Sequence, residues 1–180
     1  CGVISGLPNA HGMAADLGGG SLELAGIAGG KVGDHGSLPL GPLRLAATGI
    51  DGDELADHID DVLSRFSWIG DALDGGAIYA VGGAWRALAR LHMVQTKYPL
   101  RVIHNYQMSG RDTADFCDIV AGLGTESLSR ISVVPRARVA TLSTAALVLE
   151  RLIQASKADS VVFSANGIRE GSQFDALDEE

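Results

Sequence analysis

The chain has 180 residues, which is enough for one hydrophobic core or for half of a larger enzyme with a cleft. Its 22 Asp and Glu outnumber its 14 Lys and Arg, and the net charge of −8 argues against a general nucleic-acid binder. Apolar residues make up 46% of the chain, yet no apolar run approaches the roughly 18 residues of a membrane span, so we expect no membrane partner.

The first predicted elements form an antiparallel meander of three strands. The apolar run Met13–Leu17 is followed by Gly18–Gly20, and Ser21–Ala28 then alternates between apolar and polar residues. Gly29–Gly30 is a typical two-residue hairpin turn, and Lys31–Leu38 reads as the third strand. A glycine-rich turn therefore joins the first two strands.

Helices dominate the middle of the chain. One is predicted to begin near Asp51, because apolar residues then recur at helical spacing on one face: Leu55, Ile59, Val62, Leu63 and Phe66. Ala77–Val81 reads as a buried strand, Gly82–Gly83 as a turn, and Trp85–Gln95 as a second helix.

The last third of the chain continues the alternation of helices and strands. Ser109 is a candidate cap for a helix that extends through Val120, and a long amphipathic helix covers residues 139–153. Ser160–Ser164 reads as a final buried strand, with the turn Asn166–Gly167 and a helical tail after it. This order predicts a mixed α/β domain.

The 24 glycines are nearly twice the average usage, and one cluster stands beside a carboxylate. Gly18, Gly19 and Gly20 let successive backbone N–H groups point into one concavity, which holds phosphate oxygens, and the Ser21 hydroxyl adds a donor. Asp16 at the rim is placed to hold Mg²⁺, usually through waters, or to orient an attacking water. The structural alternative is a flexible hairpin turn in which Asp16 makes an Asx-type turn.

Two further glycine turns follow buried strands. Gly82 and Gly83 permit a ligand to approach closely in front of a helix N-terminus, although a tight strand–helix turn is the favoured explanation of this motif taken alone. In residues 164–171, Arg169 is a candidate for bidentate phosphate binding, but an ion pair with Glu170 or another nearby carboxylate is slightly favoured.

The remaining polar and reactive residues favour structural roles. The acidic residues 51–61 are explained by the first turn and the solvated face of a helix. Cys117 lies among apolar residues, which predicts a buried, inert thiol, and Trp85 and Trp68 read as packing residues. Because Cys1 and Cys117 supply almost no disulfide framework and no signal peptide is visible, we expect a cytoplasmic protein.

Four stretches in this order resemble the exopolyphosphatase / guanosine pentaphosphate phosphatase (Ppx/GppA) family. They are AADLGGGSLEL (Ala14–Leu24), LPLGPLRL (Leu38–Leu45), AVGGAWRALARLHM (Ala80–Met93) and SANGIREG (Ser164–Gly171). The resemblance implies the ribonuclease H-like fold of the actin, sugar-kinase and chaperone-ATPase superfamily. It further implies that residues 1–180 are the second, C-terminal domain of a two-domain phosphatase, with the first domain missing from a chain that starts at Cys1.

The resemblance also implies roles for individual residues. Asp16 would be the catalytic, metal-linked carboxylate, and Gly18–Ser21 the second phosphate-binding loop. Gly82 and Gly83 would lie near the phosphates, and Arg136 would face the polyanion. Two positions depart from the family: Ala84 stands where Thr is usual, and Arg138 stands where an acidic residue is more common. The family's general base lies in the first domain.

The implied activity is hydrolysis of a phosphoanhydride, with Mg²⁺ as cofactor. The whole enzyme would release terminal phosphate from inorganic polyphosphate or the 5′ phosphate from guanosine pentaphosphate, and the isolated domain is expected to be inactive. The alternatives are a non-catalytic module that binds nucleotides or alarmones such as guanosine tetraphosphate, and half of a sugar or acetate kinase. Other expected partners are the first domain and a second copy in a homodimer.

Overall fold

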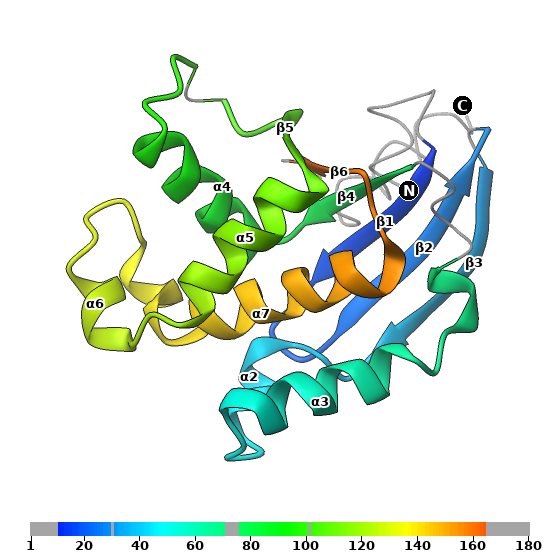
Figure 1. Cartoon of the computed structure of the whole chain (residues 1–180), viewed down its shortest axis with the longest axis horizontal. Helices are drawn as coiled ribbons and strands as arrows, with labels where there is room; N and C mark the ends of the chain where they lie inside the picture. Colours follow the sequence, from blue (N-terminus) through cyan, green and yellow to red (C-terminus); the bar gives the residue numbers. More distant parts are fainter. Residues whose placement is uncertain (1–10, 30, 71–75, 101, 165–180) are drawn as a thin grey trace, which may run out of the picture.

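A computed structural model describes residues 11–29, 31–70, 76–100 and 102–164, and its centre is a mixed six-stranded sheet (Figure 1). The strands are β1 (Gly12–Leu17), β2 (Leu22–Ala28), β3 (Lys31–Leu38), β4 (Ala77–Val81), β5 (Tyr106–Ser109) and β6 (Ser160–Phe163), in the order β3-β2-β1-β4-β6-β5. β1, β2 and β3 form the expected antiparallel meander, β4 and β6 run parallel to β1, and β5 is antiparallel to β6.

The described helices pack on one face of this sheet, and in Figure 1 α5 and α7 cross in front of the strands while α3 runs below them. The helices are α2 (Pro42–Ala46), α3 (Gly52–Leu63), α4 (Gly83–Gln95), α5 (Gly110–Ala121), α6 (Thr125–Ser129) and α7 (Val139–Ser156), with 3-10 turns η1 (Ser67–Ile69) and η2 (Arg136–Arg138). The main core includes side chains from every one of these α-helices. On the opposite face the described residues form a smaller apolar cluster that comes from strands alone: Ala14, Ile27, Tyr79 and Val81.

Successive side chains of β1 point to opposite faces of the sheet. Met13, Ala15 and Leu17 enter the main core, so Ala14 and Asp16 face the other side of the sheet. Trp85, predicted to be a packing residue, is fully buried, and its indole N–H donates to the Ala145 carbonyl at 2.8 Å. That bond joins α4 to α7 in the middle of the core.

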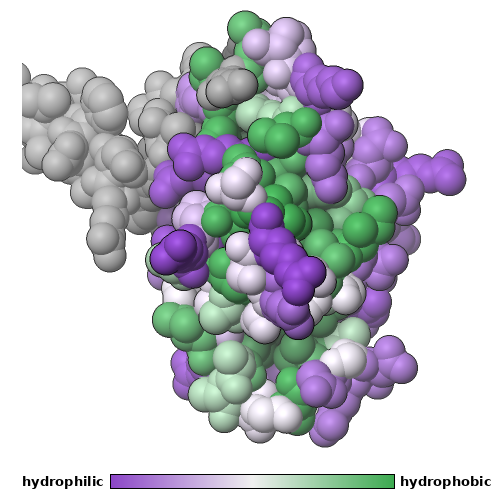
Figure 2. Space-filling model, turned by 90° about the vertical axis from the view of Figure 1, so that its left-hand side faces the viewer, coloured by the Kyte–Doolittle hydropathy of each residue, from purple (hydrophilic) through white to green (hydrophobic). Residues whose placement is uncertain are grey.

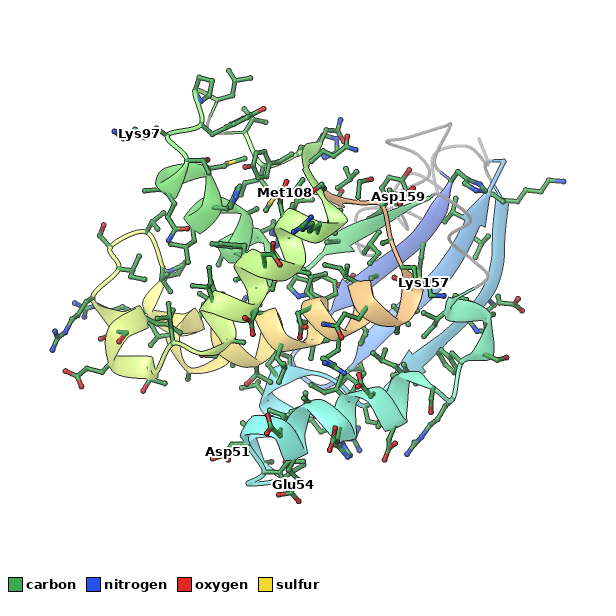
Figure 3. All side chains as sticks on the ribbon, viewed as in Figure 1. Asp51, Glu54, Lys97, Met108, Lys157 and Asp159 are labelled. Carbon is green, nitrogen blue, oxygen red and sulfur yellow. The ribbon has the colours of Figure 1, made fainter. Side chains whose placement is uncertain are left out.

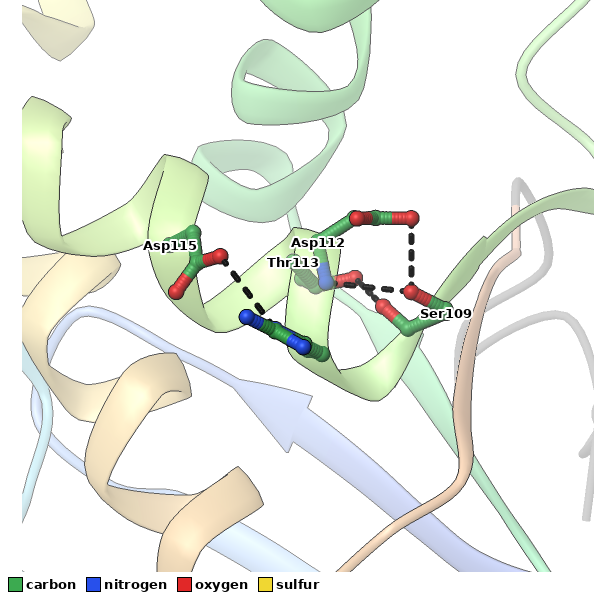
Figure 4. Close-up of polar contacts among 5 residues, drawn as sticks. Ser109, Asp112, Thr113 and Asp115 are labelled. Atoms are coloured by element: carbon green, nitrogen blue, oxygen red, sulfur yellow. Dashed lines mark hydrogen bonds and ion pairs between the residues drawn. The ribbon is translucent and has the colours of Figure 1, made fainter.

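The helices predicted within the described residues are present with small changes in their limits, and the predicted helical tail lies outside the described residues. Ser109 caps α5 as expected: its Oγ accepts from the Asp112 N–H at 3.0 Å, while Thr113 Oγ1 donates to the Ser109 carbonyl at 2.7 Å (Figure 4). Helix α4 begins at Gly83, two residues before the predicted start at Trp85. Three short elements, α2, β5 and α6, were not predicted from the sequence.

The surface agrees with the structural interpretation of the acidic residues. Asp51 and Glu54 extend outward from the N-terminal end of α3 (Figure 3), and both are exposed. Figure 2 shows the side of α4 and α6, where hydrophobic side chains reach the surface among hydrophilic ones. Among the described residues, no helix is both long and apolar enough to cross a membrane.

Helix α7 carries an acidic side chain into the interface with its neighbours. Glu150 is 8% exposed and accepts a hydrogen bond from the Gln154 amide, whereas the adjacent Arg151 pairs with Asp60 of α3. Burial raises the pKa of Glu150, Arg151 opposes that rise, and Asp118 adds to it. Cys117 is fully buried, as predicted, and burial raises the pKa of its thiol far above the usual range.

We expect Glu150→Gln to raise the free energy of unfolding at pH 7 by about 1 kcal/mol. The raised pKa means that the folded state holds the Glu150 proton more tightly than the unfolded state. The free energy of unfolding of the wild-type protein is therefore highest below the ordinary glutamate pKa. It falls as the pH rises through the pKa that Glu150 has in the folded state. The gain measured by thermal unfolding should vanish below pH ~4. Glu54→Gln on the exposed face of α3 is the control, and an equal gain there would contradict the prediction.

Candidate phosphate-binding site

The site is built on the loop Gly18–Ser21 that connects β1 to β2. The Gly18 N–H donates to the Ser21 carbonyl at 2.9 Å, which closes the turn, and Gly18–Gly20 are exposed. Within the described residues, the N–H groups of Gly19 and Gly20 have no backbone hydrogen-bond partner. Since β1 ends at Leu17, these donors are presented just beyond the carboxyl end of a central strand.

Helix α2 rests directly on this loop. The Leu43 N–H donates to the Gly19 carbonyl at 2.9 Å, and a Cβ built on Gly41 would lie 2.3 Å from the Gly20 carbonyl carbon. Gly41 itself has an ordinary extended backbone, with φ −67° and ψ 138°. Glycine is therefore required at this position for close backbone approach, and the segment Leu38–Leu45 acts as a support for the loop.

The second glycine turn approaches the first from β4. Gly82 has φ +118°, and a Cβ there would lie 2.5 Å from the Leu17 carbonyl oxygen, so only glycine fits both the conformation and the space. Gly83, which begins α4, lies against Arg138 of η2: its Cβ would be 2.5 Å from Arg138 Nη2. This arginine, rather than Arg136, contacts the turn.

A cavity of about 80 Å³ lies between these segments. It is lined by Gly18 and Gly19, by Pro42 and Leu43 of α2, by Ala84 of α4, and by Leu17, Ala137, Arg138 and Thr141. Both positions at which the sequence departs from the resembled family, Ala84 and Arg138, therefore border one space. Of the described residues that line it, Arg138 alone is charged.

Asp16 lies on the opposite side of β1 from this cavity and is paired with a second carboxylate. The hairpin register places Asp16 opposite Glu23 of β2, and both line a larger cavity of about 400 Å³ on the face of the sheet opposite the described helices. Opposed residues of an antiparallel pair have Cβ atoms about 5 Å apart, so two like charges adjoin here. A cation between two such carboxylates removes their repulsion.

This carboxylate pair fits Mg²⁺ better than a metal with an all-protein shell. Among the described residues, no group of three or more His, Cys, Asp and Glu side chains is placed to hold a metal. Mg²⁺ is usually held by one or two carboxylates, and waters and substrate phosphates complete its octahedron. Asp16 and Glu23 supply this kind of partial shell.

The structure thus brings most of the predicted residues to one end of the sheet. Asp16, Gly18–Ser21 and Gly82–Gly83 lie at the carboxyl ends of β1 and β4, which are adjacent parallel strands. Arg136 is exposed on η2, and its role stays a prediction. Arg169 and the turn at Asn166–Gly167 lie outside the described residues.

Three residues of the site were missed by the sequence reasoning. The position of Glu23 opposite Asp16 could have been predicted from the sequence. A hairpin that closes around Gly18–Ser21 pairs residue 17 with residue 22, and residue 16 with residue 23. Gly41 was quoted in a motif but given no role, and no local signal shows that it touches Gly20. Arg138 was noted only as an unusual residue, since its contact with Gly83 joins segments more than 50 residues apart.

Comparison with known proteins gives a family match and a set of structural neighbours. The model of the Ppx/GppA phosphatase family matches residues 1–180. None of the curated protein sequences matches the chain.

The structural neighbours include an exopolyphosphatase from Cytophaga hutchinsonii, with a TM-score of 0.86 and 18% identity over 99% of this chain. They also include the Ppx/GppA family member of Aquifex aeolicus, with a TM-score of 0.78 and 22% identity over 99% of this chain. The chain spans 61% and 60% of the lengths of these two proteins. At such identities the likeness shows the fold, and the predicted ribonuclease H-like α/β architecture is confirmed.

Proposed function

The chain belongs to the Ppx/GppA phosphatase family, and we propose that it forms the second domain, and half of the active site, of a phosphoanhydride hydrolase. The whole enzyme would release terminal phosphate from inorganic polyphosphate or the 5′ phosphate from guanosine pentaphosphate. The observation that carries this proposal is the convergence of Gly18–Ser21, Gly41 and Gly82–Gly83 beside Asp16. Backbone packed that closely leaves N–H donors in fixed positions, which suits a phosphoryl group.

In the proposed reaction, a water attacks the terminal phosphorus in line with the bond that breaks. A new P–O bond forms from the water, and the phosphoanhydride P–O bond breaks, giving orthophosphate and a shortened chain. The N–H groups of Gly19 and Gly20 would bind the equatorial oxygens as charge shifts onto them. The water's proton would pass to a general base outside residues 1–180.

Asp16 and Glu23 would hold Mg²⁺ at the edge of this loop. The bound ion would neutralise the negative charge of the phosphate oxygens. The carboxylate oxygens of the two side chains would also orient a water of the ion's hydration shell. Because Asp16 precedes the loop by only two residues, its position is fixed by the β1–β2 and β1–β4 pairings.

The proposal predicts that residues 1–180 alone release no phosphate from polyphosphate, because the base and the other phosphate loop belong to another domain. The measurement is phosphate release in Mg²⁺, with the whole protein as the positive control at the same concentration. Robust turnover by the isolated chain would show that its own residues complete the active site. That result would contradict the proposal that another domain supplies the base and the other phosphate loop.

The same assay with the whole protein distinguishes the substrates. Polyphosphate and guanosine pentaphosphate are compared by kcat/KM, while titration calorimetry measures the binding of guanosine tetraphosphate and ATP. A hydrolase turns over at least one of the first two. Tight nucleotide binding without any phosphate release would instead identify a sensing module built on the same fold.

A further inference from the structure

Arg138 places one positive charge against the glycine turn of the proposed site. A Cβ on Gly83 would lie 2.5 Å from Arg138 Nη2 and 2.9 Å from Cζ, so the guanidinium covers the start of α4. The ion pairs among the described residues join Arg111 to Asp115, Arg130 to Glu126 and Arg151 to Asp60, and none of them involves Arg138. Its charge is therefore not neutralised by a carboxylate of the described part of the chain.

The backbone that carries Arg138 is held in place. Its N–H donates to the Pro135 carbonyl at 2.8 Å, and its carbonyl accepts from Thr141 Oγ1 at 3.3 Å. The side chain of Arg138 can therefore change its conformation on binding a ligand, while the backbone stays in place. Anchoring of this kind lowers the entropy lost when a guanidinium binds an anion.

The cavity beside Arg138 selects an anion of small size. The walls contributed by the described residues are apolar or backbone apart from Thr141 and the arginine, and Gly18 and Gly19 form one side. The first N–H groups of α4, next to Ala84, lack partners within the helix and add positive potential. At about 80 Å³ the space is far below the 300–1,000 Å³ of typical ligand pockets, so it suits a single phosphoryl group rather than a nucleoside.

We propose that this cavity is a second phosphate subsite, in which Arg138 binds the phosphate next to the one held by Gly18–Ser21. The inference rests on the proposed function and deepens it. The site would then require at least two linked phosphates and would discriminate against orthophosphate and its simple esters. An Arg–phosphate contact is bidentate and charge-assisted, which gives both affinity and orientation.

The test compares a ligand with linked phosphates with a single phosphate. We expect Arg138→Ala in the whole protein to weaken inorganic tripolyphosphate binding about tenfold, the value of one charge-assisted contact, and orthophosphate binding less than about threefold. KM for polyphosphate should rise with kcat little changed, the pattern of a binding contact kept through the reaction. Arg111→Ala removes the same charge from an exposed site on α5 and should leave both affinities unchanged.

Two outcomes would contradict the proposal of a second phosphate subsite. Unchanged tripolyphosphate binding by Arg138→Ala would show that the guanidinium touches no phosphate, and an equal loss for orthophosphate would place it at the first phosphate. Both outcomes are independent of the hydrolase proposal, which is tested by phosphate release from the wild-type protein. Thermal unfolding of Arg138→Ala verifies that any loss arises in a folded protein.

Discussion

Asp16→Asn in the whole protein is expected to lower kcat for phosphate release by at least about 10²-fold, the loss typical of removing a key electrostatic group. Asparagine keeps the size of the side chain and removes the charge that would hold Mg²⁺ opposite Glu23. The fold should survive, because Asp16 lies on the face of β1 opposite the described helices, away from the main core. Steady-state phosphate release at saturating Mg²⁺ is the measurement.

Asp34→Asn makes the same chemical change on the exposed strand β3 and should leave turnover within about twofold. Glu23→Gln should raise the Mg²⁺ concentration that gives half-maximal rate, since one ligand of the proposed pair is lost. The double variant should be little worse than Asp16→Asn, because two residues that act through one ion are not additive. Wild-type turnover by Asp16→Asn would remove this carboxylate from the mechanism.

The elements that sequence reasoning predicted are those whose signals are local. The meander follows from apolar runs separated by glycine turns, and α7 follows from apolar residues at helical spacing. Helix α2 has only five residues, begins at Pro42 and depends on its contact with the glycine loop. Strand β5 is defined by its pairing with β6, more than 50 residues further along the chain. No local sequence pattern indicates the contact of α2 with the glycine loop or the pairing of β5 with β6.

The same distinction applies to the site. Asp16 and the glycine runs were predicted because the motif is contiguous, and Glu23 needed only the hairpin register. The contacts of Gly41 with Gly20 and of Gly83 with Arg138 are tertiary and were beyond sequence reasoning. The glycine loop at the end of β1 is thus predicted by sequence, while the residues that pack against it emerge from the folding of separate segments.

The support given by Gly41 leads to the second large effect. Gly41→Ala is expected to lower kcat/KM about 10²-fold, the cost of a displacement of about 1 Å at an active site, and the free energy of unfolding by about 1–3 kcal/mol. Backbone strain plays no part, because φ is −67°. The methyl group would instead meet backbone atoms of the loop at 2.3–2.4 Å and separate α2 from it.

Gly20→Ala is the matched control: its methyl meets no atom within 4 Å, so stability should stay within about 0.5 kcal/mol while phosphate affinity falls. Denaturant unfolding and phosphate release measure both effects, and wild-type values for Gly41→Ala would show that α2 does not shape the loop.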